Sequence, residues 1–188
     1  MEYTGKYVNP VQNGGEEWKM DVMEAILTRR SIRKYTKKPI PDAVITQLLK
    51  AGMFAPSAGN EQPWHFIVIR DRGILDTIPE YHPYSKMLFE APVAIVVCGD
   101  VTLEKHKGLW VQDCAAAVEN ILLAAHALGL GAVWLGVHPR DDREYGTRHL
   151  LGIPENVIPF AIISLGYPNE KKEQPERFNE SRIHYDAW

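Results

Sequence analysis

The longest regular pattern of apolar positions in this sequence of 188 residues runs over residues 109–130. Apolar side chains recur there at 111, 114/115, 118, 121/122, 125 and 128, which is the spacing of one helical face. Three consecutive alanines at 115–117 would let a neighbouring helix approach this one closely. The segment is predicted to be a long helix at the centre of the fold and a candidate for a subunit contact.

Helical spacing also marks three shorter segments. The first follows Asp21, a predicted N-cap, and places Val22 and later apolar residues on one face. The second follows Pro41, a residue that suits the first turn of a helix, and the third, at 141–152, opens with acidic residues. Between residues 72 and 91 the pattern changes repeatedly and favours two short helices.

Four segments rich in β-branched and aromatic residues are predicted strands. They are 64–70, 92–99, 132–137 and 158–168, and the first, WHFIVIR, is expected to be buried. Because these strands alternate with helices after a helical first third, the pattern predicts one α/β or α+β domain. We expect that domain to span residues 21–168, between a polar N-terminal arm (1–20) and a charged C-terminal tail (169–188).

Composition narrows the class of protein. With 45% apolar residues, 24% charged residues and a net charge of −3, the chain resembles an ordinary globular protein and lacks the broad basic surface of a nucleic-acid binder. It has no apolar run of about 20 residues and no signal peptide, so we expect a cytoplasmic protein without a membrane partner. Cys98 and Cys114 are predicted to be buried free thiols, and no metal-binding spacing is present.

Motifs of familiar catalytic machinery are absent from the sequence. The segment GLGLGAVWLG follows a predicted helix and precedes a strand, the reverse of a dinucleotide-binding turn. Gly129 and Gly131 fit a helix end and a turn, whereas Gly136 falls near a strand end, where backbone can approach a ligand. If the protein is an enzyme, the lack of a nucleophile–base pattern points to an organic cofactor.

The stretch RRSIRKYTKK, residues 29–38, concentrates six cations in an acidic chain. Guanidinium groups beside a hydroxyl suit a phosphate monoester, and the candidates are Arg29, Arg30, Ser31 and Arg33. The alternative is a solvated cluster at the end of a helix, and the lysines at 34, 37 and 38 fit that interpretation. A second polar loop, APSAGNEQP at 55–63, offers Ser57, Asn60 and Gln62 as donors and acceptors, with small residues between them that leave room for a planar ligand.

These motifs, in this order, resemble the FMN-dependent nitroreductase family from about Asp21 to Arg177. The matching segments are RRSIRKY, APSAGNEQPWHFIVI, the alanine-rich helix, GLGAVWLG and IPFAIISLGYP. The resemblance implies an α+β fold in which helices flank a mixed β-sheet. It also implies an intertwined homodimer with two FMN molecules at the subunit interface.

The resemblance further implies roles for particular residues. Arg29, Arg30 and Ser31 match the segment that holds the FMN phosphate and ribityl groups, and Arg33 matches a basic position near the pyrimidine edge of the flavin. Leu135 and Gly136 match a strand end whose backbone meets the flavin near N5 and O4. The loop expected to reach FMN from the other subunit contains Pro56, Ser57, Ala58 and Asn60. Among the tail cations, Arg177 is expected to close on the phosphate, with Lys171 and Lys172 as competitors.

The implied activity is transfer of two electrons from NADH or NADPH through FMN to nitroaromatic, quinone or flavin acceptors by a ping-pong mechanism. No side chain is expected to act as a catalytic residue, because the flavin carries the chemistry. The alternatives are a non-catalytic flavin store or partner-binding protein and, within the family, a reductive dehalogenase or flavin-fragmenting enzyme. The chain is short for the family, so the cover over the substrate is expected to come from residues 72–91 or 101–109.

Overall fold

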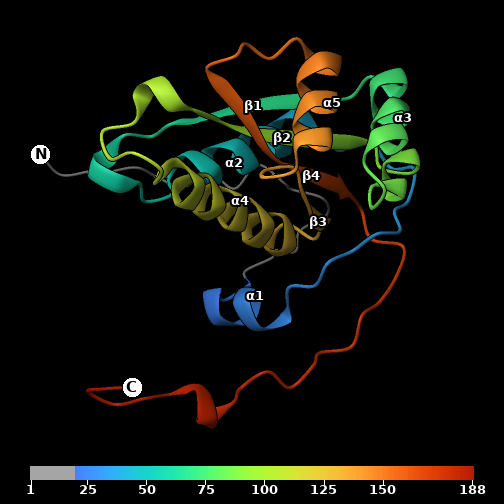
Figure 1. The fold of residues 1–188 in the computed structure, drawn as a ribbon. Coiled ribbons are helices and arrows are strands. Elements are labelled where there is room, and N and C mark those ends of the chain that lie inside the picture. The colour runs from blue at the N-terminus through green and yellow to red at the C-terminus, as the bar shows by residue number, and fades with distance from the viewer. Residues whose placement is uncertain (1–19) are drawn as a thin grey trace, which may run out of the picture.

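A four-stranded antiparallel sheet forms the centre of the protein (Figure 1). The computed structural model describes residues 20–188, so residues 1–19 of the predicted arm lie outside the described part. In spatial order the strands are β1 (Trp64–Ile69), β2 (Val93–Asp100), β4 (Val157–Gly166) and β3 (Gly131–Gly136). One parallel pairing is added to this sheet by an isolated bridge between Ser31, which lies outside the named strands, and Ala132 of β3. The α+β architecture expected from the sequence is confirmed.

The predicted helices are present. They are α1 (Val22–Thr28), α2 (Asp42–Met53), α3 (Arg72–Tyr81), α4 (Trp110–Ala127) and α5 (Asp141–Leu151). Asp21 caps α1 as predicted, because its Oδ1 accepts a hydrogen bond of 2.8 Å from the Met23 N–H. Pro41 occupies the N-cap of α2, and Lys86–Phe89 form the second short helix of the 72–91 segment.

Alternating side chains of the sheet build two apolar layers. On β2, Val93, Ile95 and Val97 pack with α2 and α4 in one cluster. The intervening Ala94, Val96 and Cys98 join the cluster that contains residues of α3 and the 86–89 turn. Each fully buried valine or isoleucine contributes about 1.5–3 kcal/mol through its removal from water. Because both faces of β2 are buried, its sequence is a continuous apolar run and does not alternate between apolar and polar residues.

The prediction that the first strand is buried was wrong. Trp64 and Ile69 at the ends of β1 are buried, but His65 and Val68 between them are exposed. The physical reason is cover: both β1 and β3 are edges of the sheet, but within residues 20–188 only β3 is flanked by a further segment, through the bridge from Ser31 to Ala132.

The two cysteines of the chain are buried free thiols, as predicted. The Cys114 thiol donates a weak hydrogen bond of 3.6 Å to the carbonyl of Cys98. Burial raises the pKa of the Cys98 thiol to about 12 and also raises the pKa of Cys114. Both thiols are therefore protonated over the physiological range.

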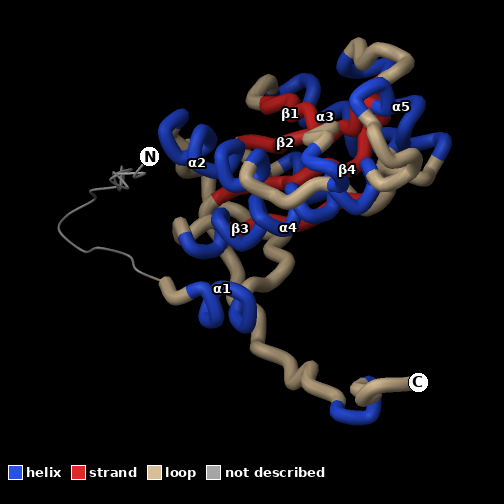
Figure 2. The backbone as a smooth tube through the Cα atoms, turned by 90° about the vertical axis from the view of Figure 1, so that its left-hand side faces the viewer, coloured by secondary structure: helices blue, strands red, loops and turns tan. Residues whose placement is uncertain are grey.

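Helix α1 and the C-terminal tail project from the compact body (Figures 1 and 2). Only Ala25 of α1 is buried, whereas Val22, Ile26 and neighbouring apolar residues are about half exposed or more. The apolar face predicted for this helix therefore does not enter the core of its own chain. Within residues 20–188, no helix has the length and apolar character needed to cross a membrane.

Candidate functional site

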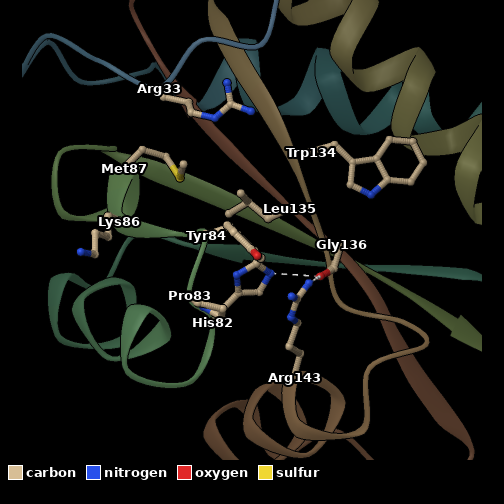
Figure 3. A pocket seen from close by; sticks show the side chains of 10 residues that line it. All are labelled: Arg33, His82, Pro83, Tyr84, Lys86, Met87, Trp134, Leu135, Gly136 and Arg143. Carbon is tan, nitrogen blue, oxygen red and sulfur yellow. Dashed lines mark hydrogen bonds between the residues drawn. The ribbon is translucent and has the colours of Figure 1, made fainter.

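Two cavities lie beside the basic segment 29–38, and Arg33 lines both of them. The first has a volume of about 470 Å³ and lies at the end of β3 (Figure 3). Its wall combines cationic and apolar side chains, among them Arg33, Lys86, Arg143, Met87 and Leu135. The second, of about 350 Å³, lies between the basic segment and the tail. Its wall includes Arg30, Ser31, Arg33, Lys172, Glu173 and Arg177.

The basic segment is held against the sheet through its backbone. The Ile32 N–H donates a 3.0 Å hydrogen bond to the Ala132 carbonyl beside the start of β3. Two glycines permit the close approach. A Cβ atom at Gly131 would lie 2.6 Å from a methyl carbon of Ile32, and one at Gly166 would lie 2.7 Å from the ring of Tyr35. The segment is therefore fixed beside the first residue of β3, Gly131, and the last residue of β4, Gly166.

Arg33 combines a fixed backbone with an available side chain. Its N–H donates a 2.6 Å hydrogen bond to Glu170 Oε1, and this bond is the main cause that lowers the pKa of Glu170. Its guanidinium makes no hydrogen bond or ion pair with residues 20–188. In Figure 3 it lies at the opposite end of the first cavity from Arg143. The side chain is thus free to meet a ligand in either cavity.

Arg29 and Arg30 are already engaged within the chain. The Arg30 guanidinium donates to three backbone carbonyls, those of Leu27, Arg29 and Glu173, and so ties the tail to the end of α1. Arg29 Nε lies 3.3 Å from Glu119 Oε1 but is buried without a partner in hydrogen-bond geometry. The predicted cofactor role of both residues therefore stays a prediction, and Arg30 has the fewest donors left for it.

The three tail cations differ in position. Lys172 and Arg177 line the second cavity, whereas Lys171 lines neither cavity. Lys172 Nζ lies 3.1 Å from Glu170 Oε2, so its charge is partly compensated. The Arg177 guanidinium forms no ion pair with residues in the described part of the chain. Arg177 is therefore the best placed of the three to receive an anion.

The end of β3 presents open backbone to the first cavity. A Cβ atom added to Gly136 would have no other atom within 4 Å. Its carbonyl accepts hydrogen bonds from His82 Nε2 at 3.0 Å and from Arg143 Nη1 at 2.8 Å. Burial lowers the pKa of His82, and the Arg143 charge lowers it further. His82 is therefore neutral at physiological pH, and its Nε2 carries the proton.

The 56–62 loop, which was predicted to contact FMN from the other subunit, lies away from both cavities of its own chain. Pro56, Ser57, Ala58, Asn60 and Gln62 line neither cavity. The loop has a defined shape, in which the Ser57 hydroxyl accepts from the Gln62 N–H and the Gln62 amide donates to Asn60. Within one chain, the structure brings together the candidates on the basic segment, the β3 end and the tail, but not this loop.

A buried carboxyl pair anchors the loop to α4. Asp113 Oδ1 accepts from the Ala58 N–H at 2.9 Å, and Glu61 Oε2 accepts from the N–H groups of Lys105 and His106. The remaining oxygens, Asp113 Oδ2 and Glu61 Oε1, are buried without a donor from residues 20–188. Burial and the Glu61 charge raise the pKa of Asp113, whereas the Lys105 N–H lowers that of Glu61. The raised pKa of Asp113 favours its protonated form, which would supply a donor for Glu61.

Sequence reasoning missed several residues of the first cavity. His82, Tyr84 and Lys86 belong to the 72–91 segment, which was predicted only as a cover, whereas no residue of 101–109 lines either cavity. Arg143 gave no signal, because an arginine in an acidic amphipathic helix resembles any solvated charge. Only the packing of α5 against the end of β3 reveals its position.

Comparison with known proteins identifies the family. The model of the nitroreductase family matches residues 26–82 and 77–167. A candidate NADH dehydrogenase/NAD(P)H nitroreductase from Methanothermobacter thermautotrophicus is 57% identical over 174 residues, which cover 93% of this chain and 91% of the relative.

Solved structures agree with that assignment. A crystal structure of a candidate NADH dehydrogenase/NAD(P)H nitroreductase from Parabacteroides distasonis has a TM-score of 0.87 and 42% identity, covering 90% of this chain and 100% of that one. A candidate nitroreductase from Desulfovibrio desulfuricans, solved in complex with FMN, has a TM-score of 0.78 and 34% identity, covering 90% and 99%. The sequence, the fold and these matches together show that the chain belongs to the nitroreductase family.

Proposed function

We propose that this protein is an FMN-dependent oxidoreductase that transfers two electrons from NADH or NADPH to nitroaromatic, quinone or flavin acceptors in a ping-pong cycle. The observation that carries the proposal is the pair of cavities that share Arg33. The second cavity offers donors for a phosphate. The first cavity is broad enough for a ring and borders the open backbone of Gly136. The FMN complex of the Desulfovibrio relative supports the choice of cofactor.

The second cavity fits the phosphate and sugar of FMN. The Ser31 hydroxyl and the Arg177 guanidinium line this cavity and have no side-chain partner within residues 20–188. Charged donors beside a neutral hydroxyl are the donor set that recognises a phosphate monoester. These groups would bind and orient the cofactor, and the tail would contribute through Arg177.

The first cavity fits the flavin ring. The chemistry that bound FMN supplies is two-electron transfer between the nicotinamide and the acceptor. The residues of the chain contribute position and charge: Arg33 and Lys86 place positive charge on the wall, which favours an anionic ligand over a neutral one. Met87 and Leu135 contribute apolar surface and reduce the access of water.

A second copy of the chain would complete the site. The 56–62 loop is ordered by internal hydrogen bonds and by Asp113, yet it does not line the cavities of its own chain. Helix α1 and the tail also expose apolar side chains, including Ile26, Phe178 and Trp188. A homodimer in which the loop of one subunit meets the flavin of the other accounts for these observations.

The absorption spectrum of the purified protein is the decisive test. We expect a yellow protein whose released flavin is FMN, which NADH or NADPH bleaches without oxygen and which menadione or nitrofurazone then restores. A flavin store would be yellow but would not be bleached rapidly by either nicotinamide. A colourless protein that takes up no added FMN would contradict the proposal.

A further inference from the structure

The carbonyl oxygen of Gly136 accepts hydrogen bonds from two side chains that neither the sequence motifs nor the proposed function requires. His82 Nε2 lies 3.0 Å away and Arg143 Nη1 lies 2.8 Å away. Figure 3 shows His82 approaching from the segment after α3 and Arg143 from α5, with both side chains converging on Gly136. The next N–H, that of Val137, donates to the Phe160 carbonyl at 3.1 Å. The peptide group between Gly136 and Val137 is thereby held at both ends.

The two donors are themselves held in place. His82 directly follows α3, and the Tyr81 ring packs so closely on α5 that a Cβ atom at Gly146 would lie 2.5 Å from it. The Tyr81 hydroxyl also donates to Thr147 at 3.2 Å. Arg143 leaves the same helix one turn earlier, and its guanidinium lies 5.4 Å from the centre of the Tyr84 ring. The α3–α5 contact therefore sets the distance between the two donors.

The two donors differ in charge. His82 is 1% exposed and neutral, so it supplies a hydrogen bond without a charge. Arg143 supplies a hydrogen bond together with a permanent positive charge on the wall of the first cavity. His82 Nδ1 and Arg143 Nε are buried and have no partner among residues 20–188, so the contact with Gly136 is the main polar interaction of both side chains.

We propose that His82 and Arg143 are positioning residues that fix the end of β3 for the flavin, and that Arg143 also makes the cavity favour reduced over oxidised FMN. The proposal rests on the proposed function. Loss of either hydrogen bond lets the Gly136 peptide move, which weakens the binding of both forms of the cofactor. Loss of the Arg143 charge weakens the binding of the reduced, anionic form more, because a cation stabilises an anion.

The test compares the affinities of four variants for FMN with those of the wild type. A neutral hydrogen bond contributes about 0.5–1.5 kcal/mol, so His82→Leu should weaken FMN binding roughly twofold to tenfold without changing the midpoint potential. His82→Gln places an amide N–H near the position of Nε2 and should restore most of the affinity. Arg143→Met should weaken binding and also lower the preference for reduced FMN by about tenfold, a shift of roughly −30 mV.

The control is Arg140→Met, which removes a positive charge at the start of the same helix without a contact to Gly136. It should leave both the affinity and the potential at wild-type values. If His82→Leu and Arg143→Met lower only the melting temperature, the two residues are structural and the inference is overturned. A shift in potential with Arg140→Met equal to that with Arg143→Met would overturn the charge argument. If the wild-type protein itself binds no FMN, the proposed function and this inference both fail.

Discussion

At the scale of single residues, the basic segment combines cofactor candidates with structural clamps. The sequence shows a run of guanidinium groups, but it cannot show that Arg30 donates to three backbone carbonyls while Arg33 donates to none within residues 20–188. That division depends on where the tail returns, which is decided by the Tyr35–Pro168 bridge and by hydrogen bonds to residues near 170.

The tail cations provide a matched pair for a phosphate test. Arg177→Ala should weaken FMN binding roughly tenfold to a hundredfold, because a hydrogen bond to a charged group contributes about 1.5–3 kcal/mol. Lys171→Ala removes an equal charge two residues after Asn169 but lines neither cavity, so it should leave the affinity unchanged. Titration of the apoprotein with FMN measures both. Equal losses in the two variants would show that only the overall charge of the tail matters.

The residues found by structure alone share one property. Leu135 and Gly136 were predicted because they belong to a motif that is continuous in sequence. His82 and Arg143 meet Gly136 from positions 54 and 7 residues away, and no local pattern connects them. Sequence reasoning therefore identifies the backbone that faces the cavity, and the fold identifies the side chains that hold it.

At the scale of elements, the apolar pattern predicted the five α-helices and four strands of the described chain, but not the single-turn helices at Ala58–Asn60, Val101–Leu103 and Glu180–Arg182. The remaining errors concern burial, that is, which side chains of an element other residues cover. The composition of β1 is that of a buried strand, but no other segment of residues 20–188 covers its His65 and Val68 side chains. The apolar face of α1 is exposed in the same way. Composition indicates what an element can bury, whereas its neighbours decide what it does bury.

The contact between the 56–62 loop and α4 should depend on pH. The pKa of Asp113 is raised above its ordinary value of 3.8 in the fold, so its contribution to stability is present at low pH and is lost as the pH rises through the raised value. The pKa of Glu61 is lowered, so its contribution has the opposite sign and is lost at acidic pH. Glu104 adds negative charge near Asp113, and His106 lies near Glu61.

Asp113→Asn isolates this effect, because asparagine resembles the protonated carboxyl group but does not titrate. We expect the variant to gain melting temperature relative to the wild type as the pH is raised from about 4 to about 8. Thermal unfolding of both proteins across that range measures the difference. Parallel curves would show that Asp113 and Glu61 share no proton in the folded protein.

At the scale of the whole molecule, the chain carries apolar surface that its own fold leaves uncovered. Val22, Ile26 and Leu27 on α1 are 48–66% exposed, and Phe178 and Trp188 on the tail are more exposed still. Stable interfaces usually bury about 1,200–2,000 Å² in total and contain such residues at their centre. A second copy of the chain is the partner that we propose, because it would bring the 56–62 loop, which lines neither cavity of its own chain, to the proposed site.

Light scattering can test the assembly. The wild-type protein should have twice the mass of one chain. Ile26→Asp should lower the measured mass toward that of a single chain, because a buried carboxylate without a partner disrupts an apolar interface. The same variant should bind FMN more weakly. Glu24→Gln changes an exposed polar residue on the same helix and should preserve both properties. A wild type that is monomeric and still binds FMN tightly would refute the dimeric site.

The buried thiols have a practical consequence. Because both native cysteines are enclosed and protonated, an intact molecule offers little to a maleimide reagent. A cysteine introduced on the exposed tail, for instance by Ser181→Cys, would then be the principal labelling point. A spin label at that position would report how far apart the tails of two chains lie, without any need to remove the native thiols first.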